Sequence, residues 1–180
     1  MFERGVRMGV DVGNARVGVA ISDPEGILAT PVKTLKRNVN THSDRRVLRR
    51  LIEIHEVTEV FIGHPRTMSG GSSSSTAMAE EYAQALVDEL AEEGREGIRI
   101  WLVDERLTTV AAQRRLHEVG LSSRSFKTVV DQVAAVNILQ QCLDALTSDR
   151  QVAGYPVEAV SADGTQRLVG SSDQNGELCD

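Results

Sequence analysis

Three strand-like segments open the chain, and the hydrophobic pattern then changes to a helical period. Residues 6–12, 16–22 and 27–34 are short, apolar and separated by the turn sequences GNA and DPEG, which predicts an antiparallel meander. Apolar residues then recur at helical spacing over residues 41–57, and a compact apolar run follows at 59–63. A chain that begins with hairpins and continues with alternating helices and strands has few folds open to it.

The second half of the chain keeps this alternation. Helical patterns cover residues 76–93, 108–119 and 126–147, with a strand-like run at 98–103. Pro31 places part of the third strand at a sheet edge, because proline lacks the N–H that a central strand needs. We therefore predict an α/β fold with a mixed five-stranded sheet, in which three antiparallel strands precede parallel strands and helices cover both faces.

The length of 180 residues suits one folded domain with a short appendage. We predict that this domain spans residues 1–147. Residues 148–180 have no sustained apolar period and are rich in Ser, Gly, Asp, Gln and Asn, which predicts an acidic, disordered C-terminal tail. Aromatic residues make up only 3% of the chain, which argues against binding of single strands by rows of stacked rings.

The sequence carries no signal for a membrane or an oxidising compartment. No apolar run approaches the roughly 20 residues that cross a bilayer, and the start of the chain lacks the pattern of a signal peptide. Cys142 and Cys179 lie far apart without metal-ligand spacing, so neither a disulfide framework nor a zinc site is expected. We predict a cytoplasmic protein.

Basic residues are concentrated at the front of the chain. Residues 1–50 carry a net charge of +5, although the whole chain has a net charge of −6. Four arginines of the first helix lie at i, i+4 spacing, namely Arg45, Arg46, Arg49 and Arg50. They either track the phosphates of a nucleic acid or form an ordinary solvated helix face.

Two acidic positions lie on or directly after predicted strands. Asp11 interrupts an apolar strand, where an unpaired carboxylate is costly. It either bonds to its own turn at Gly13 or takes part in a functional site. Asp104 and Glu105 follow the strand at 98–103, and ligands bind at the carboxyl ends of strands in open α/β sheets. Helix capping and a solvated ion pair are the alternatives there.

A third acid, Asp131, lies on the last helix near a face that contains small alanines. A surface aspartate in the first helical turn, favoured by the helix dipole, is the alternative. Acids this far apart in the sequence can converge over the middle of a sheet. Convergent carboxylate oxygens are what Mg²⁺ or Mn²⁺ requires, and two such ions can hydrolyse a phosphodiester.

The loop after the strand at 59–63 contains Gly63, His64, Pro65 and Arg66, followed by a Gly/Ser-rich stretch. Such a loop can cradle a phosphate, but a flexible linker is the favoured interpretation, because no Walker A lysine follows. We assign no catalytic role to His64.

Four segments together resemble one protein family. GVDVGNARVGVAISD, IGHPRTMSG, VDERLTT and KTVVDQVAAVNILQ, in this order across residues 6–143, are similar to the YqgF family, also called RuvX. Members are Holliday junction resolvases and pre-16S rRNA processing nucleases with an RNase H-like fold. The family usually carries an aliphatic residue where this chain has His64.

The resemblance implies the site residues and the cofactor. Asp11, Glu105 and Asp131 are the expected catalytic acids and metal ligands, with two ions of Mg²⁺ or Mn²⁺, and Asp104 replaces Glu105 if Glu105 is structural. The expected contacts to nucleic acid are Arg16, Arg66, Arg106 and Lys127.

The implied function is metal-dependent endonucleolytic cleavage, with the 5′ end of pre-16S rRNA as the leading substrate. Resolution of Holliday junctions is the alternative, and it predicts a homodimer because a four-way junction has two-fold symmetry. A non-catalytic RNA-binding module is a further alternative, against which the three acids argue. An actin-like ATPase also carries D-x-G before a hairpin, but it needs a second lobe that 180 residues do not supply.

Overall fold

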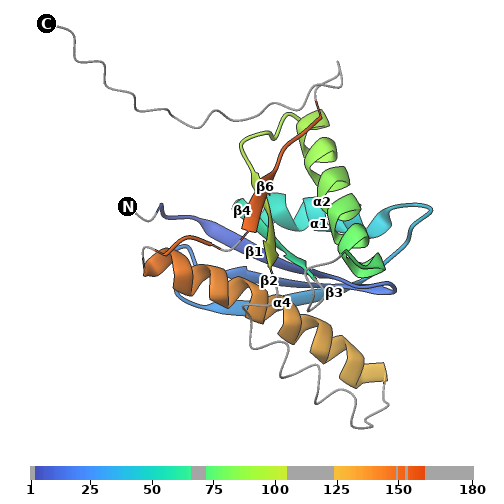
Figure 1. Cartoon of the computed structure of the whole chain (residues 1–180), viewed down its shortest axis with the longest axis horizontal. Coiled ribbons are helices and arrows are strands. Elements are labelled where there is room, and N and C mark those ends of the chain that lie inside the picture. The colour runs from blue at the N-terminus through green and yellow to red at the C-terminus, as the bar shows by residue number, and fades with distance from the viewer. Residues whose placement is uncertain (1–2, 66–71, 105–123, 149, 153, 161–180) are drawn as a thin grey trace, which may run out of the picture.

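The structure is a computed structural model of the 180-residue chain (Figure 1). The description covers the backbone of residues 3–65, 72–104, 124–148, 150–152 and 154–160. Side chains of the last helix are described from residue 131 onward.

The antiparallel start of the chain forms as predicted. Strands β1 (Val6–Val12) and β2 (Arg16–Ser22) have the predicted bounds, because apolar β-branched runs end there at turn residues. Strand β3 (Ala29–Lys36) begins two residues later than predicted. It lies at one edge of the sheet, which confirms the edge position indicated by Pro31.

Helices and parallel strands alternate through the rest of the chain. The elements are α1 (Ser43–Ile54), β4 (Val57–His64), α2 (Ser74–Glu92), β5 (Arg99–Asp104) and α4 (Arg124–Thr147). The predicted helix at residues 108–119 lies outside the described residues. A Ser73 capping box begins α2: the Thr76 N–H donates to Ser73 Oγ, and the Ser73 N–H donates to Thr76 Oγ1.

Within the described residues the sheet has six strands in the order β3-β2-β1-β4-β5-β6, so the predicted number of five is wrong by one. Strand β6 (Gly154–Val157) pairs antiparallel with β5. Its sequence, GYPV, has only four residues and contains both Gly and Pro, so local propensity gives no strand signal. The sheet therefore extends past residue 147 into the segment predicted to be disordered, whereas residues 161–180 lie outside the described part.

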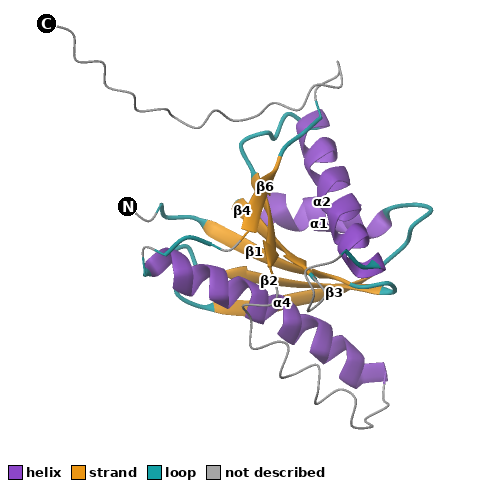
Figure 2. Ribbon diagram, in the orientation of Figure 1, coloured by secondary structure: helices purple, strands orange, loops and turns teal. Residues whose placement is uncertain are grey.

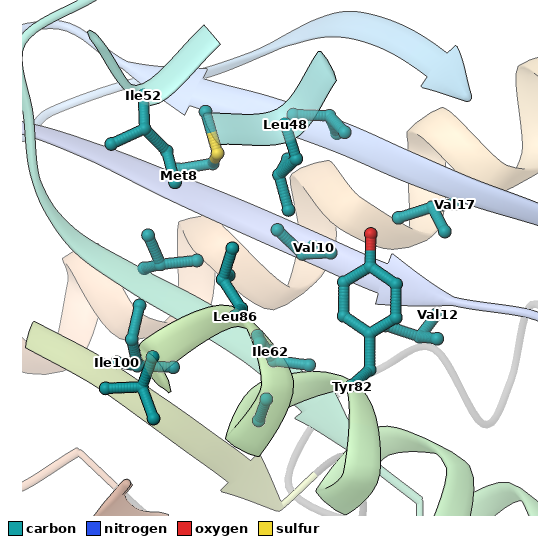
Figure 3. Close-up of a cluster of buried hydrophobic side chains, with 14 of the residues drawn as sticks. Met8, Val10, Val12, Val17, Leu48, Ile52, Ile62, Tyr82, Leu86 and Ile100 are labelled. Carbon is teal, nitrogen blue, oxygen red and sulfur yellow. The ribbon is translucent and has the colours of Figure 1, made fainter. Parts of the chain in front are cut away.

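Helices cover both faces of the sheet, as predicted (Figure 2). On one face α1 and α2 pack over a core that includes Met8, Val10, Leu48 and Leu86 (Figure 3). On the other face lies α4, with a smaller core whose members include Phe61, Val103, Ala135 and Leu139. No helix in the described part of the chain is long and apolar enough to span a membrane.

Helix α4 approaches the sheet closely because glycine lies beneath it. A Cβ atom on Gly9 of β1 would lie 2.6 Å from the Ala135 carbonyl oxygen and 2.7 Å from Leu139 Cβ. Gly9 and the small Ala135 together bring the helix axis toward the strands. The position of α4 over β1 and β2 is therefore fixed by packing.

Cys142 of α4 lies in the core and is 2% exposed. Burial, with a smaller contribution from the negative charge of Glu59, raises the pKa of its thiol to about 12. In a Cys179→Ser background, we expect Cys142 to react with iodoacetamide at pH 8 at least about 100-fold more slowly in the folded than in the urea-unfolded protein. Equal labelling rates would contradict this burial.

Candidate active site

Asp11 lies one residue before the end of β1, at the carboxyl edge of the sheet. Val10 and Val12 belong to the core beneath α1 and α2, so strand alternation turns Asp11 toward α4. The side chain is partly buried. In the β1–β2 pairing its register partner is Gly18, which places the two Cα atoms about 4.5–5.5 Å apart.

Asp131 of α4 lies directly over that same glycine. A Cβ atom built on Gly18 would come within 2.0 Å of the Asp131 carbonyl oxygen and 3.3 Å of Asp131 Cβ. Only a residue without a side chain allows this approach. The fold therefore brings Asp11 and Asp131, two of the three predicted acids, to one place on the α4 face.

Arg16, the first residue of β2, reaches into this place. Its Nε donates to Asp131 Oδ2 at 2.6 Å, and the two side chains are 32% and 24% exposed. The ion pair compensates the charge of one carboxylate at a point where two come together. Sequence reasoning placed Arg16 near nucleic acid but did not find this contact, and binding of nucleic acid by Arg16 stays a prediction.

Asp104 ends β5 at the carboxyl edge of the sheet, where it lines a cavity together with Gln141 and Cys142 of α4. It is in register with His64 of β4. Glu105 lies outside the described residues, so Asp104 as its replacement stays a prediction.

His64 connects three elements beneath the surface. It is 1% exposed, and its Nε2 lies 2.8 Å from Glu80 Oε1 of α2. The Tyr155 hydroxyl of β6 is 3.5 Å from the same nitrogen, and the two rings meet edge to face. These contacts connect β4 to α2 and to β6.

For the remaining predicted site residues the structure describes at most the backbone. Glu105, Arg66 and Arg106 lie outside the described residues, and Lys127 lies on α4 with only its backbone described. Within the described part of the chain, no group of three or more His, Cys, Asp or Glu side chains is placed to hold a metal ion. The described part thus contributes two carboxylates, whose hard oxygen donors fit Mg²⁺ or Mn²⁺.

The arginines of α1 do not form a free basic stripe. Arg45 pairs with Glu89 of α2 at 2.8 Å, and Arg49 pairs with both Glu89 and Glu93. Arg50 pairs with Glu53 on its own helix at 2.6 Å. For Arg45 and Arg49 the solvated-face interpretation is wrong, because their side chains are 13% and 19% exposed and join α1 to α2; phosphate tracking stays a prediction.

Comparison with known proteins identifies the relatives of this chain. A family model described as RuvX, Holliday junction resolvase, matches residues 5–145. The "Putative pre-16S rRNA nuclease" of Mycobacteroides abscessus is 45% identical over 141 residues, which cover 78% of this chain and 82% of that protein. A protein of the same name from Leifsonia xyli subsp. xyli is 43% identical over 154 residues, covering 86% and 95%.

Among solved structures, T. thermophilus RuvC in complex with a Holliday junction substrate matches with a TM-score of 0.50 and 14% identity. The match covers 85% of this chain and 99% of that one. At this identity the likeness concerns the fold alone.

Proposed function

The chain belongs to the RuvX family of nucleases with an RNase H-like fold, and from this premise we propose that it is a metal-dependent endonuclease that processes the 5′ end of pre-16S rRNA. Two relatives at 43–45% identity bear the name "Putative pre-16S rRNA nuclease". Such a role implies work in the cytoplasm, where ribosomes are assembled.

One observation carries the proposal. Asp131 rests on Gly18, the register partner of Asp11, so two acids from distant parts of the chain share one face at the carboxyl edge of the sheet. Two adjacent carboxylates repel each other unless a cation lies between them. Here the Arg16 guanidinium is the cation that contacts Asp131. This contact supports a site that binds positive charge.

Asp11 and Asp131 would hold the metal ions, and Glu105 is the proposed third ligand. When bound, two divalent ions supply the charge that activates water and stabilises the leaving oxygen of a phosphodiester. Asp11 and Asp131 are partly buried. Less water therefore screens the site, and the attraction between these carboxylates and a bound cation is stronger.

Substrate contacts are proposed for Arg66, Arg106 and Lys127, together with Arg16. With only 3% aromatic residues in the chain, recognition rests on the shape and charge of the nucleic-acid backbone. A second candidate, resolution of Holliday junctions, is favoured by the description of the matching family. That reaction would require a homodimer.

A cleavage assay tests the proposal and separates the two substrates. Purified protein is given an RNA that spans the 5′ leader and the start of mature 16S rRNA, or a four-way DNA junction. Each reaction contains Mg²⁺, Mn²⁺ or EDTA, and an RNA that begins at the mature 5′ end is the matched control. We expect metal-dependent cleavage of the leader RNA and none of the control. Cleavage of the junction alone would transfer the function to recombination, and binding without cleavage would indicate a non-catalytic module.

A further inference from the structure

The Arg16 guanidinium is hydrogen-bonded to a carboxylate oxygen of Asp131, which is a proposed metal ligand. Its Nε lies 2.6 Å from Asp131 Oδ2, and Asp11 belongs to the same face because its register partner Gly18 lies beneath the Asp131 backbone. The guanidinium is therefore a monovalent cation bound to one of the two carboxylates that the proposed site offers to a divalent ion.

The backbone on both sides of this ion pair is fixed. The Gly13 N–H donates to the Arg16 carbonyl oxygen at 2.8 Å within the β1–β2 hairpin. The Asp131 carbonyl lies so close to Gly18 that a Cβ atom there would approach it to 2.0 Å. A change in the ion pair is thus confined to two side chains, and both retain access to solvent.

We propose that the Arg16 guanidinium substitutes for the metal ion in the metal-free protein and leaves Asp131 when a divalent cation binds. This inference rests on the proposed metal-dependent nuclease. An ion pair of this exposure is weak because water screens it. A divalent ion between two carboxylates carries twice the charge and contacts both. Arg16 thus acts through Asp131, as a competitor that sets the metal affinity of the site.

The opposite role is also physically reasonable and gives the opposite result. If Arg16 kept its contact while the metal was bound, it would orient Asp131 toward the ion, as partners of metal ligands do. Removal of Arg16 would then weaken metal binding. The sign of the change in metal affinity therefore distinguishes competition from orientation.

The experiment measures Mn²⁺ binding to the full chain by isothermal titration calorimetry, without substrate. Wild type is compared with Arg16→Gln and with Arg50→Gln, which removes the same charge from an exposed pair with Glu53 on α1. We expect Arg16→Gln to bind Mn²⁺ about 5-fold more tightly than wild type. Arg50→Gln should change the affinity less than about 2-fold, as a distant screened charge.

A second measurement needs no metal. In EDTA, Arg16→Gln should lower the thermal midpoint by about 2–4 °C, because the carboxylate of Asp131 loses its counter-charge. Adding Asp131→Asn to Arg16→Gln should restore most of that loss.

The outcomes separate this inference from the function on which it rests. Unchanged or weaker Mn²⁺ binding by Arg16→Gln, with normal binding by wild type, would overturn the competition and leave the metal site intact. An unchanged midpoint in EDTA would likewise overturn it. Absence of Mn²⁺ binding by both wild type and Arg16→Gln would overturn the competition and the metal-dependent nuclease together.

Discussion

Replacing Asp11 with Asn is expected to lower metal-dependent cleavage by about 100-fold or more while leaving the fold intact. The amide keeps the size of the side chain but removes the negative charge that a hard divalent ion requires. Because Asp11 shares its face with Asp131, loss of one charge relieves repulsion in the metal-free protein, so the thermal midpoint in EDTA should not fall.

Two variants on α4 complete this test: Asp131→Asn is a second loss of a metal ligand, and Asp144→Asn is the matched control. Asp131→Asn should reduce cleavage to a similar extent as Asp11→Asn. Asp144→Asn, on the same helix, changes an exposed carboxylate that accepts a hydrogen bond from Gln140 at 3.0 Å, and it should retain full activity. Initial cleavage rates on the leader RNA in Mg²⁺ measure all three variants. Activity of Asp11→Asn within a few-fold of wild type would remove Asp11 from the mechanism.

The parts of the fold that could be predicted are those that local sequence determines. Strands β1 and β2 have the predicted bounds because β-branched runs stop at turn residues. Strand β6 could not be found in this way. Its four residues include Gly154 and Pro156, and the strand exists because β5 offers an edge to pair with.

The same distinction applies to the candidate site. Asp11 and Asp131 were predicted from motifs, and the structure brings them together. The Arg16–Asp131 ion pair depends on how α4 crosses β2, and no local pattern contains that information. The arginines of α1 illustrate the same point. The ion-pair partner of Arg45 is Glu89 on α2, far along the sequence, and no local pattern identifies it.

A buried ion pair at the opposite end of the sheet carries the second large effect. Arg7 of β1 is in register with Glu59 of β4, and its Nε lies 2.7 Å from Glu59 Oε2. Arg7 also donates to the carbonyl oxygens of Gly5 and Glu3. The two paired side chains are 3% and 7% exposed, so water does not screen the pair, and Glu59 Oε1 also lies 3.2 Å from Arg99 Nε.

Glu59→Ala should therefore lower the free energy of unfolding by about 3–5 kcal/mol, because the buried, charged guanidinium of Arg7 loses the carboxylate 2.7 Å away and Arg99 loses its 3.2 Å contact with Glu59. Urea denaturation measures the change. Glu53→Ala is the control: its pair with Arg50 is equally short, 2.6 Å, but the side chains are 58% and 67% exposed. That loss should stay below about 1 kcal/mol.

Replacing both partners distinguishes the buried charge from lost packing. If the cost of Glu59→Ala arises from removing the carboxylate beside the buried charge of Arg7, then Arg7→Met combined with Glu59→Leu should be far more stable than Glu59→Ala alone. If the double variant were as unstable as Glu59→Ala, the pair would matter through its contacts with Gly5 and Glu3. Equal losses for Glu59→Ala and Glu53→Ala would contradict the view that burial decides the strength of this ion pair.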